Sequence, residues 1–195
     1  MQRSYPIRND KIYFITPMQA DDALDVVKSK LKNLLGSAYY TVGVRFIAPS
    51  YPFNYRKAIR KYGNPSTLLI VDLGCGNYRI DPDIVALDGT DYDAVDIVAD
   101  LNALPFADGS IEILSSRSAL EHVAEIERAV DELKRCSKSG GFGVHFVPFI
   151  YPFHASPHDY SRWTPAGFPR LFADWPVVEQ TGTTGPISLF LICFI

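Results

Sequence analysis

The sequence predicts an α/β fold built on one mostly parallel sheet. The first observation is that short apolar runs recur between residues 67 and 181, interrupted by stretches with helical periodicity. The second is that glycines or acidic residues follow the carboxyl ends of the first three runs. Strands that alternate with helices favour a parallel sheet, and such sheets bind ligands beyond the carboxyl ends of their strands.

Six apolar runs are candidate strands, because short uninterrupted apolar runs are typical of strands buried on both faces. They cover residues 67–73, 84–88, 95–98, 111–115, 143–148 and 177–181. Only ten residues separate Leu73 from Ile84, and Pro82 is one of them. A crossover helix needs more room than this, so we expect the first one to be missing or reduced to a single turn. The second crossover, residues 89–94, is shorter again.

Four stretches carry helical signals. Residues 16–19 resemble a capping box with proline at the first helical position, and the periodic apolar positions that follow end at Gly36. A second short helix is expected over 54–62. A third should carry apolar residues from Leu120 to Leu133 on one stripe and end at 139–141. A fourth is expected to begin at Thr164.

The 195 residues are expected to form one domain, with a helical cap (1–63), a core (64–181) and an apolar tail (182–195). With a net charge of −3, the chain has no overall electrostatic attraction for nucleic acid. Three cysteines without a CxxC pair, and an N-terminus without an apolar run, favour a cytoplasmic protein with reduced thiols.

The tail from Ile187 to Ile195 is strongly apolar but much shorter than the ~20 residues that span a bilayer. Two interpretations stay open. The tail is a buried terminal element, such as a last antiparallel strand of the sheet, or it is the start of a longer hydrophobic segment. In the second case the sheet lacks its final strand, and the tail could associate with a membrane.

The residues with the clearest chemical meaning follow the first three strands. Gly74-Cys75-Gly76 ends the first strand, where glycines let a ligand approach the backbone and successive N–H groups can form a polar nest. Asp88 ends the second strand, where a carboxylate can accept hydrogen bonds from both ribose hydroxyls of an adenosine. Asp100 follows the third strand and could accept from an adenine amino group. An isolated GxG turn is a weak signal, and the three together are a stronger one.

These segments resemble the class I S-adenosylmethionine-dependent methyltransferases, of the broad type-11 group. The first motif is VDLGCG (71–76), VALD (85–88) matches the acidic second strand, and DLNALPFADGSIEIL (100–114) matches the adenine loop with the fourth strand. LEHV (120–123), with a helix ending KRCSKSGG, resembles a further signature. The resemblance covers about Leu68 to Phe172 and implies a Rossmann-like sheet with S-adenosylmethionine as cofactor.

Carried over position by position, the resemblance implies contacts along the whole cofactor. Asp72, Gly74 and Gly76 would hold its methionine end, with Cys75 in the same loop. Asp88 and the adjoining Gly89 would bind the ribose, Asp100 the adenine amino group, and the amide of Leu101 the adenine ring. Ser116 and Arg117 would line the floor near the sulfonium.

The sequence departs from the family pattern after Gly76. Asn77 stands where a further glycine is common, and the helix whose N-terminus would face the cofactor carboxylate is predicted to be absent. Arg79 could compensate by pairing with that carboxylate. The alternative is an ordinary exposed loop arginine.

Methyl transfer to a hydroxyl would also need a base, and histidine titrates near neutrality. The candidates are His158, His154 and His122, with His158 preferred because it lies in the loop after the fifth strand. Each could instead be structural, and His145 within the strand is expected to be a packed core residue. His154, His158 and Asp159 could hold zinc or iron, but their spacing matches no established metal signature, and we expect no metal.

Two other function classes stay open beside methyl transfer. A nicotinamide-dependent enzyme would need a fuller glycine fingerprint with a helix directly after it, and a non-catalytic binding domain would fit the lost crossovers. For a methyltransferase, the lack of a basic face favours a small-molecule, sugar or lipid-linked glycan acceptor over nucleic acid. The sequence makes no prediction about oligomeric state.

Overall fold

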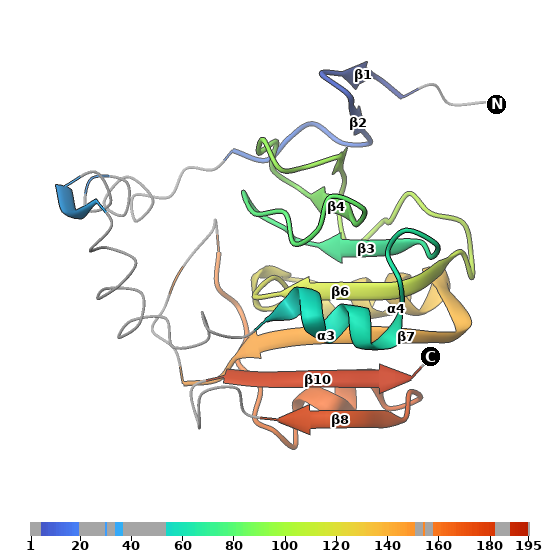
Figure 1. The fold of residues 1–195 in the computed structure, drawn as a ribbon. Coiled ribbons are helices and arrows are strands. Elements are labelled where there is room, and N and C mark those ends of the chain that lie inside the picture. Colours follow the sequence, from blue (N-terminus) through green and yellow to red (C-terminus); the bar gives the residue numbers. More distant parts are fainter. Residues whose placement is uncertain are drawn as a thin grey trace.

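A computed structural model describes residues 5–19, 30, 34–36, 54–150, 154, 158–181 and 188–194. The described chain forms one nine-stranded sheet with helices on both faces (Figure 1). The strands are β1 (Ile7–Arg8), β2 (Lys11–Tyr13), β3 (Ile70–Leu73), β4 (Val85–Asp88), β5 (Ile97–Val98), β6 (Ile111–Arg117), β7 (Ser137–Pro148), β8 (Val177–Thr181) and β10 (Ser188–Phe194). The helices are α3 (Tyr55–Tyr62), α4 (Ile126–Cys136) and the short 3₁₀ turns η2 (Leu120–His122) and η3 (Phe168–Phe172).

The strand order is β1-β2-β5-β4-β3-β6-β7-β10-β8. The five strands from β5 to β7 in this order are mutually parallel, whereas β10 runs antiparallel to both of its neighbours. The predicted α/β fold with a mostly parallel sheet is therefore confirmed. All six expected strands are present. β3, β4 and β5 start one to three residues later than predicted, because turns and bends take their first apolar positions, whereas β7 starts six residues earlier, at Ser137.

Alternate residues of the strands face two separate cores, as the two-residue repeat of a strand requires. Val71 and Leu114 face the larger core, which α4 and η3 cover. Ile70 and Ile113 face the opposite side, where Ile59 of α3 is completely buried. Figure 1 shows α3 and α4 on opposite faces of the sheet. Both faces of the central strands are therefore buried, which explains why the sequence shows continuous apolar runs there.

The first two crossovers contain no helix, as the sequence predicted. Residues 74–84 and 89–96 form turns and bends only. The first crossover is held by Arg79, which donates to the carbonyl of Ile84 at 3.2 Å and forms an ion pair with Asp96. Asp96 in turn accepts from the N–H of Ala86 at 2.8 Å. These polar contacts replace the packing that a helix would have supplied.

The helix expected from Leu120 is divided in two. η2 ends at His122 and α4 begins at Ile126, yet the predicted stripe from Leu120 to Leu133 is buried as expected. The predicted stop at 139–141 is wrong, because α4 ends at Cys136 and β7 starts at Ser137, whose hydroxyl donates to the carbonyl of Leu133 at 2.6 Å. Gly141 instead lets β7 approach β6, since a side chain there would overlap the carbonyl oxygen of Glu112.

The N-terminal cap differs from its prediction. Residues 7–13 form β1 and β2, and β2 extends the sheet by pairing with β5, which the sequence analysis did not anticipate. Residues 16–19 are irregular, so the helix start expected there is wrong. The N–H of Met18 donates to the carbonyl of Gly89 at 2.9 Å, and this contact fixes the segment in an extended path. Most of the predicted helix up to Gly36 lies outside the described residues.

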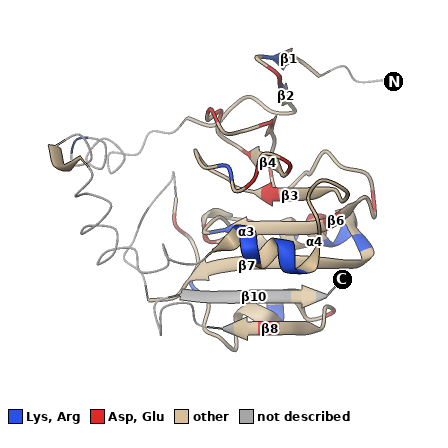
Figure 2. Cartoon of the chain, in the orientation of Figure 1, with Lys and Arg blue, Asp and Glu red and all other residues tan. Residues whose placement is uncertain are grey.

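Helix α3 matches the prediction for 54–62. Asn54 caps it by accepting from the N–H of Lys57 at 2.9 Å, and Gly63 follows its end. Its outer face carries the blue cluster of basic residues in Figure 2. Arg56 and Arg60 both bind the buried carboxylate of Asp81, so part of this basic face is neutralised within the protein.

The tail forms the central antiparallel strand β10. It pairs with β7 from Ser188 to Phe194 and with β8 on its other edge. Residues 188–194 therefore form the antiparallel strand of the first interpretation, and Cys193 within it is buried. None of the helices among the described residues has the length and apolar character needed to cross a bilayer.

Candidate active site

The carboxyl ends of β3, β4 and β5 open onto one pocket of about 350 Å³, within the usual range for small-molecule sites. Its wall contains residues from all three predicted turns. Residues that follow β6, residues of η2 and residues of the segment 158–160 also line the pocket. The lining residues are Met18, Gly74, Gly76, Asp88, Gly89, Thr90, Tyr92, Ala99, Asp100, Leu101, Asn102, Ser118, Ala119, His122, Val123, Ala124, His158 and Tyr160.

The turn after β3 is shaped by two glycines with positive φ. Gly74 has φ of +64°, and a side chain there would overlap the Cβ of Ala119. Gly76 has φ of +58° and open space where its Cβ would be. The N–H groups of Gly74 and Cys75 both donate to the carbonyl of Leu87, so they do not form the open nest that the sequence suggested. The turn therefore contributes space and shape to the pocket.

Asp88 is held rigidly at the end of β4. Its Oδ2 accepts from the N–H of Gly76 at 2.8 Å, and its Oδ1 accepts from the N–H of Thr90 at 2.8 Å. Burial raises the pKa of this carboxyl, and the two N–H groups act in the opposite direction. Each carboxylate oxygen can accept more than one hydrogen bond, so Asp88 can still receive donors from a ligand.

Asp100 orders the loop after β5. Its Oδ1 accepts from the backbone N–H of Asn102 at 2.9 Å and from the side-chain amide of the same residue at 3.1 Å. This is the local turn that aspartate favours. It presents Asp100, Leu101 and Asn102 together on the pocket wall.

Asp72 and Cys75 lie beneath the pocket surface. Asp72 is 2% exposed, and neither carboxylate oxygen has a hydrogen-bond partner among the described residues. Burial raises its pKa to about 7, and the charge of Arg117 acts in the opposite direction. Cys75 is also buried, which raises the pKa of its thiol. Both residues support the turn from below and are absent from the described pocket wall.

Ser116, Arg117 and Arg79 are placed away from the pocket wall. Ser116 is buried and shares a 2.9 Å hydrogen bond with Nδ1 of His145. The guanidinium of Arg117 lies over the rings of Tyr78 (4.3 Å) and Tyr55 (5.1 Å). Arg79 forms an ion pair with Asp96, so a cofactor carboxylate would have to compete with that side chain. The acidic partner lies on the neighbouring crossover and was not visible from sequence spacing.

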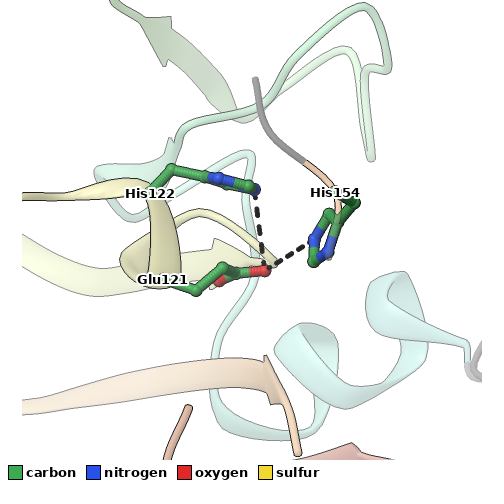
Figure 3. A group of neighbouring side chains, drawn as sticks. All are labelled: Glu121, His122 and His154. Carbon is green, nitrogen blue, oxygen red and sulfur yellow. Dashed lines mark ion pairs between the residues drawn. The ribbon is translucent and has the colours of Figure 1, made fainter. Parts of the chain in front are cut away.

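Two of the three candidate bases line the pocket, and the third lies beside them. His122 and His158 line the pocket, and Nδ1 of His122 lies 2.5 Å from the carbonyl oxygen of His158. His154 lies beside them, with its Nε2 3.5 Å from Oε1 of the buried Glu121 (Figure 3). Asp159 accepts from the backbone N–H of His154 at 2.9 Å and binds the guanidinium of Arg162. His145 is a packed core residue, as expected, stacked on Phe172 with its pKa lowered by burial to about 3.

Sequence reasoning missed several residues of the wall. Thr90, Tyr92 and Asn102 lie two to four residues after strand ends, so extending the strand-end rule that found Asp88 and Asp100 could have found them. Ser118 has φ of +48°, which is uncommon outside glycine and concentrates at functional sites. Two aromatic residues from the segment after β7 are placed nearby: Tyr160 lines the pocket and Trp163 packs on the core.

Comparison with known proteins agrees with this geometry. The type-11 family described as a methyltransferase domain matches residues 71–144, which contain β3 to β6, α4 and the glycine turn. An uncharacterized methyltransferase of Mycolicibacterium gilvum (strain PYR-GCK) is 42% identical over 52 residues. That match covers 26% of this chain and only about a fifth of the relative's length.

Solved structures share the fold at low sequence identity. The 1,6-didemethyltoxoflavin-N1-methyltransferase of Burkholderia thailandensis, solved with 1,6-didemethyltoxoflavin and S-adenosylhomocysteine, has a TM-score of 0.60 and 14% identity, with 97% of each chain covered. A SAM-dependent methyltransferase of Aquifex aeolicus has a TM-score of 0.57 and 13% identity, covering 85% of this chain and 97% of its own. Residues 71–144 are similar to the type-11 methyltransferase domain, and the fold of the described chain is similar to that of these two class I methyltransferases.

Proposed function

We propose that this protein transfers the methyl group of S-adenosylmethionine to a small-molecule, sugar, or glycan- or lipid-linked acceptor. The observation that carries the proposal is the pocket in which the glycine turn after β3, Asp88 and Asp100 share one wall. S-Adenosylmethionine supplies an activated methyl group on a sulfonium. The protein's own task is therefore to position the two reactants and to exclude water.

The residues present fit an adenosine. Asp88 is fixed by two backbone N–H groups and would accept the ribose hydroxyls with its remaining lone pairs. Asp100 would accept from the adenine amino group, and the N–H of Leu101 would donate to the ring. Gly89 adjoins Asp88 on the pocket wall, where its backbone would lie beside the ribose. The methionine end would pass over Gly74 and Gly76, where open space surrounds the Cβ position of Gly76.

The residues beneath the pocket wall would support its shape rather than contact the cofactor. Asp72 and Cys75 would shape the turn from below, and Ser116 and Arg117 would hold the end of β6 through His145 and the two tyrosines. Arg79 has no place among the proposed cofactor contacts, because Asp96 binds it.

The acceptor would enter beside His122, His158 and Tyr160, which line the remaining wall. A carbonyl oxygen can only accept a hydrogen bond, so Nδ1 of His122 keeps its proton toward His158. This leaves the lone pair of the neutral ring on Nε2, where it can take a proton from a hydroxyl acceptor. We therefore favour His122 as the candidate base, with His158 second and His154 one step behind the wall.

Isothermal titration of the protein with S-adenosylmethionine, S-adenosylhomocysteine and NAD tests the proposal. We expect 1:1 binding of the first two and none of NAD. Binding of NAD alone would overturn the proposal in favour of an oxidoreductase, and binding of none of the three would indicate a non-catalytic domain.

Asp100→Asn tests the adenine contact specifically. The amide oxygen can still accept from Asn102, but the amide nitrogen presents a donor where an acceptor is needed. We expect S-adenosylhomocysteine affinity to fall by ~1–3 kcal/mol, the cost of an unpaired polar group. Asp93→Asn is the matched control, because Asp93 is exposed and absent from the described pocket wall. Equal affinities of the two variants would remove Asp100 from the site.

A further inference from the structure

Three side chains meet beside the pocket in a group that the cofactor contacts do not explain. Glu121 and His122 are adjacent in η2, and His154 comes from the segment after β7 (Figure 3). One ligand atom from each residue lies within 4.8 Å of the others. The rings of His122 and His154 stand nearly perpendicular, with centroids 5.0 Å apart, and both direct Nε2 toward Glu121.

Glu121 lacks the partners that a buried carboxylate needs. Its side chain is fully buried, and neither oxygen has a hydrogen-bond partner among the described residues. Moving an ionised carboxylate out of water is unfavourable unless a positive charge or hydrogen-bond donors compensate. The groups that its Oε1 faces are the two imidazoles.

The distances between Glu121 and the two imidazoles distinguish a hydrogen-bonded group from a metal site. A charge-assisted N–H···O bond is about 2.7–2.9 Å long. The distance from Oε1 of Glu121 is 3.5 Å to Nε2 of His154 and 3.9 Å to Nε2 of His122, too long for such bonds. Two ligands bound about 2.0–2.1 Å from one tetrahedral ion lie roughly 3.3 Å apart. The observed spacing is closer to that of ligand atoms around one ion.

The opposite ring nitrogens have the partners that metal-binding histidines use. Nδ1 of His122 lies 2.5 Å from the carbonyl oxygen of His158, and Nδ1 of His154 lies 3.4 Å from a carboxylate oxygen of Asp159. The carbonyl oxygen can only accept, so it keeps the proton of His122 on Nδ1 and leaves the lone pair on Nε2. The guanidinium of Arg162 can only donate and lies 3.2 Å from Nδ1 of His154, so this nitrogen accepts in the metal-free protein. Metal binding to Nε2 of His154 would move the ring proton to Nδ1, where it would point to Asp159, which Arg162 also holds.

We propose that Glu121, His122 and His154 bind one divalent transition-metal ion of the Zn²⁺ type, with an open coordination position facing the pocket. Two imidazoles and one carboxylate suit Zn²⁺, whereas Mg²⁺ and Ca²⁺ prefer oxygen ligands. His122 belongs to both the metal group and the pocket wall, so the ion would lie where the acceptor enters. This group differs from the His154, His158 and Asp159 set considered from sequence.

The site would act on the acceptor, a role that rests on the proposed methyl transfer. An ion at the open position lowers the pKa of a bound hydroxyl. The hydroxyl proton leaves to solvent, the oxygen–carbon bond to the methyl group forms, and the carbon–sulfur bond of the cofactor breaks. His122 would then serve as a metal ligand rather than as the base.

Titration of chelator-treated protein with Zn²⁺ alone tests the site without any methyl acceptor. We expect one ion per chain, and Co²⁺ in its place should give visible absorption bands of a nitrogen- and oxygen-ligated ion. Glu121→Gln and His154→Gln should each weaken Zn²⁺ binding by more than about 100-fold, above the 10–100-fold loss typical of outer-shell changes. His158→Gln is the matched control, because it keeps the backbone carbonyl that holds His122 and should retain binding.

S-Adenosylhomocysteine binding, measured on the same samples, separates the two proposals and reports whether each variant is folded. Wild-type protein that binds S-adenosylhomocysteine but not Zn²⁺ would overturn the metal site and leave the proposed function intact. Zn²⁺ binding without S-adenosylhomocysteine binding would support the metal site and count against the proposed function. Unchanged Zn²⁺ affinity in folded Glu121→Gln and His154→Gln would also overturn the site.

Discussion

Asp72 is the last but one residue of β3 and Asp88 ends the neighbouring β4, and the fold gives their carboxyl groups different surroundings. Asp88 receives two backbone N–H groups, from Gly76 and Thr90. Asp72 lies one layer deeper, where its oxygens have no hydrogen-bond partner among the described residues. Burial therefore raises the pKa of Asp72 to about 7, while Arg117 limits the rise. The protein carries this unfavourable group beneath the turn at which the proposed cofactor would bind.

The buried Asp72 should make stability depend on pH. Its pKa is 3.8 in the unfolded chain and about 7 in the fold, so between these values the folded state binds the extra proton. Stability then falls as pH rises through this window. Each unit of pKa difference is worth about 1.4 kcal/mol of stability. Above this pH window, Asp72→Asn should therefore raise the free energy of unfolding by a few kcal/mol.

Urea unfolding of ligand-free wild type and Asp72→Asn, from about pH 4 to about pH 8, measures this difference. The variant should be the more stable protein at the alkaline end, and the two curves should converge at the acidic end. Parallel curves would show that Asp72 is not the titrating group.

At the scale of elements, no crossover helix follows the turn after β3. The turn alone would therefore hold the methionine end of the proposed cofactor. Residues 74–84 contain no helix, so the turn geometry depends on the backbone of Gly74 and on the contact of Arg79 with Asp96. Gly74 has positive φ and also touches Ala119, which follows β6. The first turn and the residues that follow β6 therefore constrain each other, and both line the pocket.

Gly74→Ala should be more damaging than an equivalent change elsewhere. Positive φ alone costs an alanine roughly 1–2 kcal/mol, and at Gly74 the added methyl also overlaps Ala119. Gly140→Ala is the matched control, since Gly140 has φ of +87° and open space around its Cβ position.

Denaturant unfolding should show a larger loss for Gly74→Ala, and titration should show weakened S-adenosylhomocysteine binding in that variant only. Equal losses in the two variants would mean that the contact with Ala119 relaxes freely and that the turn is not tightly constrained.

At the scale of the whole molecule, the strand order places three polar turns at one edge of the sheet. β3, β4 and β5 are adjacent and parallel, so their carboxyl ends open on the same side. A ligand bound there contacts three strands at once and should stabilise the entire sheet. β10 completes the opposite half by pairing with both β7 and β8.

S-Adenosylhomocysteine at about one hundred times its dissociation constant should stabilise the fold by about 2.7 kcal/mol. For a chain of this length, that corresponds to a rise in Tm of roughly 5–10 °C. Differential scanning calorimetry measures the shift, with NAD at the same concentration as control. An equal rise with NAD would contradict the assignment of the pocket.

Local sequence patterns determined the strands, the loss of the first crossover helix and the three polar turns, because strand burial, loop length and turn chemistry depend on neighbouring residues. The same patterns placed His145 in the core and α3 at residues 54–62. They missed the two strands at residues 7–13, of which β2 pairs with β5, and at residues 16–19 a contact to Gly89 overrode the helical signal.

Only the tertiary structure decided which distant side chains meet. Arg79 binds Asp96 on the next crossover, the apolar tail enters the sheet between β7 and β8, and His154 approaches Glu121 and His122. Each outcome depends on contacts between segments far apart in the chain. Their geometry is set by strand order and packing, which residue spacing does not encode.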